Sequence, residues 1–88
     1  MKVLQKWSYE AKEYKDYYIP KEWHTPVYTN DMEEIVNCVQ CGKELSYGEC
    51  YTSKEVHNRM GLGYGVCPKC YEEEVARWRK SYEFDRKD

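Results

Sequence analysis

Four cysteines are spaced as the ligands of a single metal ion. Cys38 and Cys41 form one C-x2-C pair, and Cys67 and Cys70 form a second pair after the intervening residues 42–66. Two tight turns of this kind each deliver two thiolate sulfurs to one tetrahedral ion, and zinc is the metal most often bound in this way. The spacing therefore predicts one structural Zn²⁺ held by these four side chains.

The residues beside the two pairs suit a thiolate site. Gly42 follows the first pair, and a residue without Cβ there lets the backbone turn so that amide N–H groups point at the sulfurs. Lys43 and Lys69 flank the sulfurs. Their charges would offset part of the negative charge that four thiolates place on a divalent ion.

Paired cysteines have two other common uses in proteins. Disulfides would suit a secreted mini-protein, but the start "MKVLQKWSYE" lacks a signal-peptide apolar core and no stretch approaches the ~18 apolar residues of a membrane span. A cytosolic location, where thiols stay reduced, is therefore expected. A thioredoxin-like redox pair would need a single C-x2-C beside a βαβ pattern, which this chain does not show.

The fifth cysteine and the two histidines could also bind a metal, but they are expected to lie outside the predicted site. Cys50 is expected to be a small buried residue in a strand, with a reactive thiol or an alternative ligand as the other readings. His57 would be a substitute ligand, but four sulfurs already complete a closed site. His24 lies in a Pro-bracketed stretch and is expected to be a loop residue without a partner.

The segment after Pro68 has the pattern of a helix. Its apolar residues recur at helical spacing and form one stripe: Tyr71, Val75, Trp78 and Tyr82. Glu73 and Arg77 would support the helix as an i,i+4 pair. Residues 72–74 are glutamates in its first turns, where the positive end of the helix dipole favours carboxylates. These glutamates are therefore expected to have an ordinary helix-stabilising role.

Between the two cysteine pairs the sequence predicts a hairpin. Residues 47–53 and 61–67 have strand patterns, and the second alternates apolar residues with glycines. Thr52 and Glu55 have the spacing of a capping box and Gly61 could end a helix, so residues 54–60 are expected to form one or two helical turns. Residues 2–9 are expected to form a short strand.

The N-terminal third is rich in aromatic residues. Ten tyrosines and three tryptophans inflate a hydrophobic content of 41% in 88 residues, so a single domain with a small, largely aromatic core is expected. Residues 19–32 are predicted to be extended and wrapped on the metal module. The rings either complete that core or form an exposed binding face, since such rings are enriched at binding hot spots. The candidate partner-binding residues are Trp7, Tyr14, Tyr17, Tyr18 and Trp23.

Each C-x2-C pair with its turn is called a knuckle below. The order of a first knuckle, a hairpin, and a second Cys-Pro-x-Cys knuckle that leads into a helix resembles the treble-clef and zinc-ribbon families. The resemblance covers about residues 36–80, and it implies a small α+β zinc-stapled domain with Cys38, Cys41, Cys67 and Cys70 as ligands. A zinc ribbon has a second knuckle ending in Gly before another strand, so the treble clef fits better. The knuckles also resemble small zinc proteins of low-GC Gram-positive bacteria and their phages, including compact anti-sigma inhibitors. The chain is therefore expected to divide into an aromatic-rich N-terminal segment, a four-cysteine zinc domain and a polar tail, at residues 1–35, 36–82 and 83–88.

Three functions compete on this basis. The first is a protein-interaction or regulatory module, such as a small inhibitor or adaptor of a bacterial or phage-host protein, with a homodimer as one version. The second is a nucleic-acid-binding zinc domain, which the net charge of −2 and the lack of a basic segment disfavour. The third is a rubredoxin-like iron electron carrier, although the second pair here lacks the following Gly. An enzymatic role is not expected, because four thiolates leave zinc no open position.

Overall fold

The computed structural model describes residues 1–85, with side chains through Ser81, and shows a small α+β protein with antiparallel sheets and a C-terminal helix. The elements are β1 (Lys2–Ser8), β2 (Glu13–Ile19), β3 (Ile35–Asn37), β4 (Glu44–Ser46), the 3-10 turn η1 (Tyr47–Glu49), β5 (Tyr51–His57), β6 (Gly63–Val66) and α1 (Pro68–Asp85). The predicted strand at residues 2–9 and the predicted helix after Pro68 are confirmed. Residues 86–88, the end of the predicted polar tail, lie outside the described residues, and α1 continues through 83–85.

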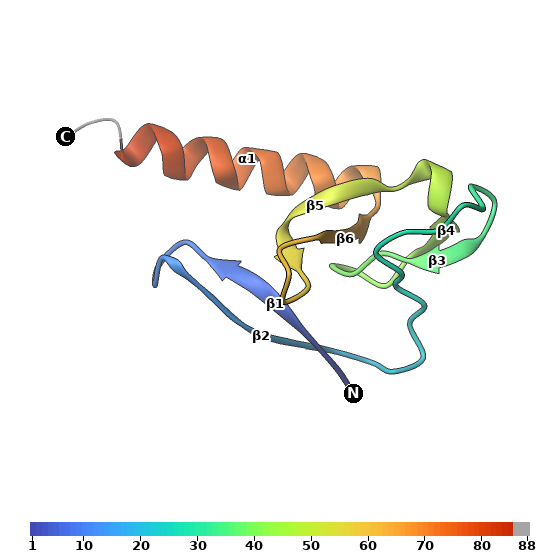
Figure 1. Cartoon of the computed structure of the whole chain (residues 1–88). Helices are drawn as coiled ribbons and strands as arrows, with labels where there is room; N and C mark the ends of the chain where they lie inside the picture. The colour runs from blue at the N-terminus through green and yellow to red at the C-terminus, as the bar shows by residue number, and fades with distance from the viewer. Residues whose placement is uncertain (86–88) are drawn as a thin grey trace.

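The larger sheet has four antiparallel strands in the order β2-β1-β5-β6. β1 pairs along its whole length with β2, and on its other side Lys6 is paired with Val56 of β5. The aromatic N-terminal third therefore contributes two strands to the sheet that also contains the hairpin between the cysteine pairs. Figure 1 shows α1 running along β5, with the turn of the β1–β2 hairpin beneath the C-terminal half of the helix.

A second, two-stranded sheet presents the first cysteine pair. β3 and β4 are antiparallel, with Val36 opposite Leu45, and residues 38–43 form the connection between them. Residues 20–34 contain no helix or strand, as predicted for an extended segment. His24 holds this segment against β3, since its backbone N–H donates to Asn37 and its ring contacts Glu34 at 2.6 Å. The expectation that His24 has no partner was wrong.

The core is aliphatic and cysteine-rich rather than aromatic. The buried apolar side chains come from all the strands, from the first knuckle and from the start of α1: Leu4, Ile19, Val36, Cys38, Val39, Leu45, Val56, Val66, Cys67 and Cys70. Tyr17, Trp23, Tyr47 and other rings pack around this core without being fully buried. The tyrosines stay at its rim because a phenolic hydroxyl needs a hydrogen-bond partner when buried. Tyr17, for example, donates its hydroxyl to the carbonyl oxygen of Val39 at 3.0 Å.

The face that α1 buries differs from the predicted apolar stripe. Cys70 and Glu74 are its buried side chains, whereas Trp78 is 46% exposed and Tyr71 stacks on Tyr51 with ring centroids 4.7 Å apart. The reason is that Cys70 must point at the other cysteines, and this fixes the rotation of the helix about its axis. Tyr82 lies outside the residues whose side chains are described.

The predicted helical turns at residues 54–60 are wrong, because β5 continues to His57. Glu55, which the predicted capping box paired with Thr52 at a helix start, instead points from β5 toward α1 and contacts Arg77, and Ser53 contacts Glu74. The chain turns at Asn58, whose side-chain oxygen accepts from the N–H groups of Met60 and Leu62, and Gly61 adopts φ 85°. The predicted strand at residues 47–53 begins only at Tyr51, because residues 47–49 form η1.

Candidate metal centre

Three separate parts of the chain bring the four predicted ligands together. Cys38 and Cys41 lie in the β3–β4 connection, Cys67 follows β6, and Cys70 is in the first turn of α1. Their sulfur atoms all lie within 4.8 Å of one another, and three of the four residues are buried. Cys38, Cys41, Cys67 and Cys70 therefore form a cluster that could hold one metal ion.

The sulfur spacing suits a tetrahedral thiolate site. A zinc–sulfur bond of about 2.3 Å implies sulfurs about 3.8 Å apart in a regular tetrahedron. Cys41 and Cys67 have their sulfurs 3.7 Å apart. None of the five cysteines forms a disulfide in this structure.

The first knuckle has the backbone shape that a thiolate site requires. Gln40 donates its backbone N–H to the sulfur of Cys38 at 3.4 Å, and such amide contacts stabilise the negative charge of a thiolate. Gly42 adopts φ 82°, and a Cβ there would lie 2.5 Å from the Trp23 ring. Glycine at position 42 therefore provides both the left-handed turn and the room for Trp23, which confirms its predicted role in the turn.

The thiols of Cys41, Cys67 and Cys70 have shifted pKa values, and the shifts differ in direction. Burial raises the pKa values of Cys41 and Cys70. Burial also acts to raise the pKa of Cys67, but hydrogen bonds from the backbone of Cys70 and from neighbouring thiols outweigh it and lower that pKa. One thiolate is thus stabilised at the expense of its neighbours, so a cation is needed before all four can be ionised together. Lys43 and Lys69 line a hollow of about 540 Å³ beside this cluster.

Cys50 and His57 lie outside the cluster, as predicted. Cys50 is half-buried rather than buried and precedes β5 rather than lying within it, and its side chain packs against Gly65. Burial, together with the charges of Cys38 and Cys67, raises the pKa of the Cys50 thiol to about 11. The ring of His57 lies 5.3 Å from that of Tyr14, away from the four sulfurs.

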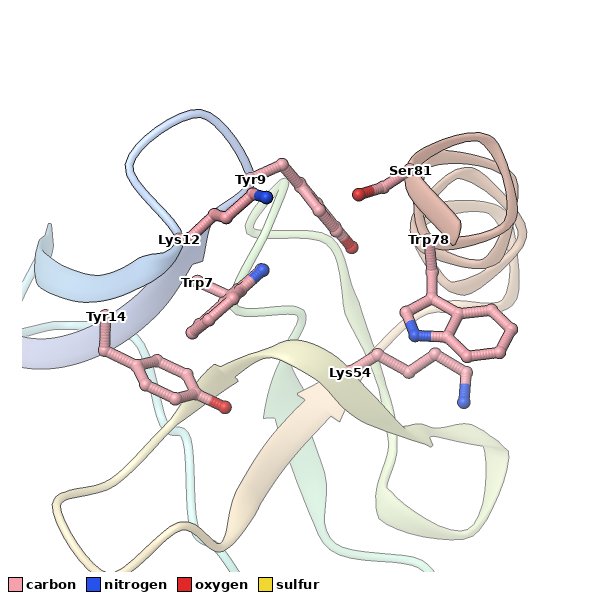
Figure 2. A pocket seen from close by; sticks show the side chains of 7 residues that line it. All are labelled: Trp7, Tyr9, Lys12, Tyr14, Lys54, Trp78 and Ser81. Carbon is pink, nitrogen blue, oxygen red and sulfur yellow. The ribbon is translucent and has the colours of Figure 1, made fainter. Parts of the chain in front are cut away.

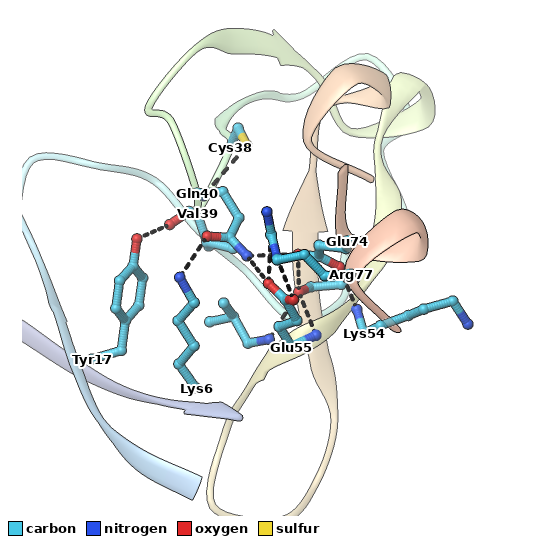
Figure 3. A network of polar contacts seen from close by, with 11 residues as sticks. Lys6, Tyr17, Cys38, Val39, Gln40, Lys54, Glu55, Glu74 and Arg77 are labelled. Carbon is cyan, nitrogen blue, oxygen red and sulfur yellow. Dashed lines mark hydrogen bonds and ion pairs between the residues drawn. The ribbon is translucent and has the colours of Figure 1, made fainter. Parts of the chain in front are cut away.

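A buried carboxylate that the sequence did not reveal lies next to the cluster. Glu74 is 0% exposed, one turn after Cys70. Its oxygens accept hydrogen bonds from the side chains of Gln40 at 2.8 Å and Ser53 at 2.7 Å, and from the backbone N–H of Lys54 at 2.6 Å (Figure 3). Glu74 therefore joins the first knuckle, β5 and α1, and its expected role as a simple helix-dipole residue was incomplete.

A second buried carboxylate pairs with the helix. Glu55 is 1% exposed and accepts two hydrogen bonds from Arg77, at 2.8 Å from Nε and 2.7 Å from Nη2. Burial acts to raise the pKa of Glu55, but the hydrogen bonds and charge of Arg77, with further hydrogen bonds from Tyr9 and Gln40, lower it. Arg77 thus pairs with Glu55 across the sheet–helix interface. The predicted pairing of Arg77 with Glu73 was wrong.

Gln40 links these two carboxylates to the first knuckle. Its side-chain nitrogen donates to Glu55 at 2.9 Å as well as to Glu74, and its side-chain oxygen accepts from Lys6 of β1 at 3.2 Å. Figure 3 shows the amide placed between Lys6 and the carboxylates. We call Gln40, Ser53, Glu55, Glu74 and Arg77 the polar network. One signal of it was present in the sequence, since Glu74 and Arg77 follow Cys70 at i+4 and i+7.

The five candidate partner-binding residues divide into two groups. Trp7 and Tyr14 are paired across β1 and β2, with ring centroids 5.0 Å apart, and Tyr18 lies further along the same face of the hairpin. Tyr14 and Tyr18 are exposed. Tyr17 and Trp23 instead pack against the core. The structure therefore brings three of the five together on one outer face.

Comparison of the chain with protein-family models, with curated proteins and with solved structures gives no match. Within residues 1–85, no helix is both long enough and apolar enough to cross a membrane. The fold and the site by themselves define a small α+β protein with a four-cysteine cluster suited to one structural metal ion.

Proposed function

We propose that this chain is a structural-zinc module that binds another protein. The observation that carries the proposal is the cluster of four cysteine sulfurs, all within 4.8 Å of one another, at the junction of the β3–β4 connection, β6 and α1. Soft thiolates in a tetrahedral set favour zinc, with iron as the other metal commonly bound by four cysteines. The order of knuckle, hairpin and helix supports a treble-clef assignment.

The metal in this proposal has a structural role and no catalytic one. Four thiolate ligands complete the coordination of zinc and leave no position for a water or a substrate. The cluster also joins elements that have few apolar residues with which to hold each other, since only a small set of side chains is buried. Metal binding in such a domain supplies a large part of the folding free energy.

The protein partner is inferred from exposed aromatic residues. Tyr14 is 45% and Trp78 is 46% exposed, although both belong to elements that pack into the fold. Exposed rings of this kind are enriched where proteins bind one another. The net charge of −2 supports a protein partner over a phosphate backbone. An inhibitor or adaptor role is consistent with a small module of this type.

The metal part of the proposal is tested by metal analysis and substitution. Purified protein should carry one zinc per chain by native mass spectrometry and elemental analysis. Cys38→Ser and Cys70→Ser should each lose the metal and the cooperative melt, because each removes a ligand from the closed site. Full retention of a cooperative melt after chelation would contradict a structural metal, and a red, iron-containing sample would favour the rubredoxin-like alternative.

The partner is tested by affinity capture from the lysate of the source cell, with and without nuclease. The proposal expects one protein to be captured by the metal-loaded chain and to survive nuclease treatment. Capture should be lost with Tyr14→Ala, whereas Met60→Ala, a matched change at another exposed apolar residue, should retain it. Capture that depends on nucleic acid would support the second class of function instead.

A further inference from the structure

The side of α1 that faces away from the sheet carries a shallow hollow. It has a volume of about 340 Å³ and is lined by residues of the helix alone: Tyr71, Glu72, Val75, Ala76 and Arg79. With 3.6 residues per turn, the centre of this hollow lies opposite Glu74, the side chain through which α1 contacts Ser53 and Lys54 of β5. Glu72, Ala76 and Arg79 are exposed accordingly.

The other sides of the helix face the rest of the molecule. Figure 1 shows β5 running beneath α1. Figure 2 shows Trp78 and Ser81 on the side of the helix that faces the β1–β2 hairpin, where Trp7 and Tyr9 lie. The hollow is therefore on the outer face of the helix, away from both the sheet and the hairpin.

Four of the residues that line the hollow have the spacing of a packing hole between helices. Glu72, Val75, Ala76 and Arg79 follow one another at i, i+3, i+4 and i+7. This is the diamond of four side chains that receives a side chain of a neighbouring helix in knobs-into-holes packing. Ala76 is the smallest of the four, and a small residue at the contact lets two helix axes approach closely. The shape of the hollow therefore favours a helix as its occupant.

The two ends of the hollow carry opposite charges. Glu72 is at its N-terminal end and Arg79 is seven residues later, about 10 Å further along the helix axis. Within residues 1–85, neither side chain forms an ion pair or a hydrogen bond. An antiparallel copy of the same helix presents its charges in the reverse order, so each carboxylate meets a guanidinium. The outer face of α1 is therefore complementary in charge to itself.

We propose that the protein forms a symmetric dimer in which the outer faces of two α1 helices pack antiparallel. A twofold axis between residues 75 and 76 brings Val75 of each copy against Val75 of the other, with the two Ala76 side chains beside them. Glu72 of each copy pairs with Arg79 of the other. The same patch is used twice, as in most protein dimers. This self-association goes beyond the proposed binding of another protein, and it uses neither Tyr14 nor Trp78.

Charge determines the direction of the pairing, and contact size determines its strength. A parallel pair of helices would place Glu72 beside Glu72 and Arg79 beside Arg79, and such like-charge contacts are unfavourable. The antiparallel pair contains few apolar residues, so it buries less surface than a standard stable interface. The dimer should therefore dissociate on dilution, and added salt should weaken it because the ion pairs are exposed.

The test is sedimentation equilibrium of the metal-loaded protein at concentrations up to about 1 mM. The average mass of the unchanged protein should rise reversibly from one chain toward two. Glu72→Arg and Arg79→Glu should each weaken self-association by about tenfold or more, because each places like charges at both ends of the contact. An equimolar mixture of these two variants should associate again, since one copy then supplies only cations and the other only carboxylates at these positions.

Glu73→Arg is the matched control. It makes the same change in charge at the next residue of α1, which lies outside the hollow, and it should leave self-association unchanged. Ala76→Arg places a long charged side chain at the centre of the hollow and should abolish the dimer. Zinc content and the thermal melt establish that each variant is folded, and Ala76→Arg tests the same contact if a charge reversal prevents folding.

Three results would overturn the inference. These are an average mass of one chain at every concentration up to about 1 mM, self-association that is unchanged by Glu72→Arg and Ala76→Arg, and a mixture of the two charge-reversal variants that does not associate. A dimer that is lost with Tyr14→Ala and kept by the α1 variants would place the contact on the hairpin instead. Capture of another protein by the α1 variants would leave the proposed function in place in each of these cases.

Discussion

At the residue scale, Gln40 shows how a side chain between two cysteines of the cluster can serve the rest of the fold. The amide nitrogen carries two hydrogens, and it donates to two carboxylates that are both buried. No other residue type of this size offers two donors together with the acceptor that Lys6 uses. The identity of residue 40 is therefore set by Glu55, Glu74 and Lys6 as much as by the cysteine cluster.

We predict that Gln40→Ala destabilises the zinc-loaded protein by about 1–3 kcal/mol, because buried acceptors lose a donor. Urea denaturation with zinc in excess measures the change, and zinc stoichiometry should stay at one per chain. Gln5→Ala is the matched control, since it removes only an exposed hydrogen bond to Asp16 and should change stability by about 0.5 kcal/mol or less. Equal effects of the two substitutions would show that the polar network contributes nothing beyond a surface contact.

Replacing Cys50 by Ala should leave the metal content unaltered and lower the free energy of unfolding by about 1–2 kcal/mol at most. The thiol packs against Gly65 but is outside the cluster of four sulfurs, so only its packing is lost. Elemental analysis measures the zinc content, and denaturation measures the free energy of unfolding. Loss of zinc from this variant would mean that Cys50 belongs to the ligand set.

The reactivity of Cys50 should follow its raised pKa. With a pKa of about 11, the thiol is almost wholly protonated at neutral pH. Alkylation by iodoacetamide in the zinc-loaded protein should therefore be about 200-fold slower at pH 8 than for an ordinary cysteine, which has a pKa of about 8.5. The rate should keep rising tenfold per pH unit between pH 7 and 9, and a plateau near pH 8.5 would contradict burial of the thiol.

At the element scale, the rotation of α1 decides which residues meet the sheet. Cys70 points at the cluster, and the residues one and two turns later then face β5. These residues are Glu74 and Arg77, so the interface between helix and sheet consists of a hydrogen-bonded carboxylate and an ion pair rather than of apolar stripe residues. The helix is held by polar contacts that depend on geometry, and such contacts are costly to break once they are buried.

Arg77→Ala should therefore destabilise the protein by up to about 3 kcal/mol at pH 7, less than for a fully buried pair because the guanidinium is 45% exposed. The pKa of Glu55 is lowered in the folded protein. The ion pair thus contributes its full stability above the ordinary carboxyl pKa of about 4.3 and loses it as the pH falls toward the lowered value.

The measurement is the difference in unfolding free energy between the two proteins at several pH values. The loss of zinc–thiolate bonds in acid affects both proteins, so their difference reports Glu55. This difference should shrink below about pH 4.3. A difference that stays constant with pH would mean that Arg77 stabilises the fold by packing alone. Arg79→Ala, at an exposed position on the same helix, is the control and should have little effect at any pH.

At the scale of the whole molecule, one small core and one cysteine cluster hold an elongated structure. The chain measures 45 × 24 × 20 Å, and the β1–β2 hairpin and the C-terminal half of α1 extend from the same end of it (Figure 1). The cluster lies where the smaller sheet, β6 and α1 meet. The hairpin is tied to this region by β5 and by the hydrogen bond between Lys6 and Gln40.

Removal of the metal is therefore predicted to affect the hairpin as well as the cluster. After chelation, amide hydrogen exchange should accelerate in β1 and β2 together with residues 36–45, because binding of the metal to the folded state stabilises every element that unfolds with it. Restoring zinc should restore the protection. Protection of β1 that survives chelation would show that the four-stranded sheet folds independently of the metal.

The parts of the fold that the sequence predicted are those set by local spacing. Each C-x2-C pair and the start of α1 depend on residues that are close in sequence, so the patterns around Cys38 and Pro68 revealed them. The burial of Glu55 and Glu74 depends on how the helix is turned against β5, which no local pattern contains. β2 was missed because Tyr17 and Ile19 face the core while Tyr14 and Tyr18 face outward, so aromatic residues occupy both faces and hide the alternation.

The pairing of β1 with β5 has a consequence for how the protein forms. β1 is made early, but one of its edges is completed only by residues 56 and 57, and the fourth sulfur arrives with residue 70. During synthesis the β1–β2 hairpin remains a two-stranded ribbon until β5 has been made, and such a ribbon is marginally stable in water. Pairing strands so distant in sequence is slow. The nascent chain therefore exposes Leu4, Ile19 and its aromatic rings for longer than a chain of local contacts would, and association between nascent chains is most expected in that interval.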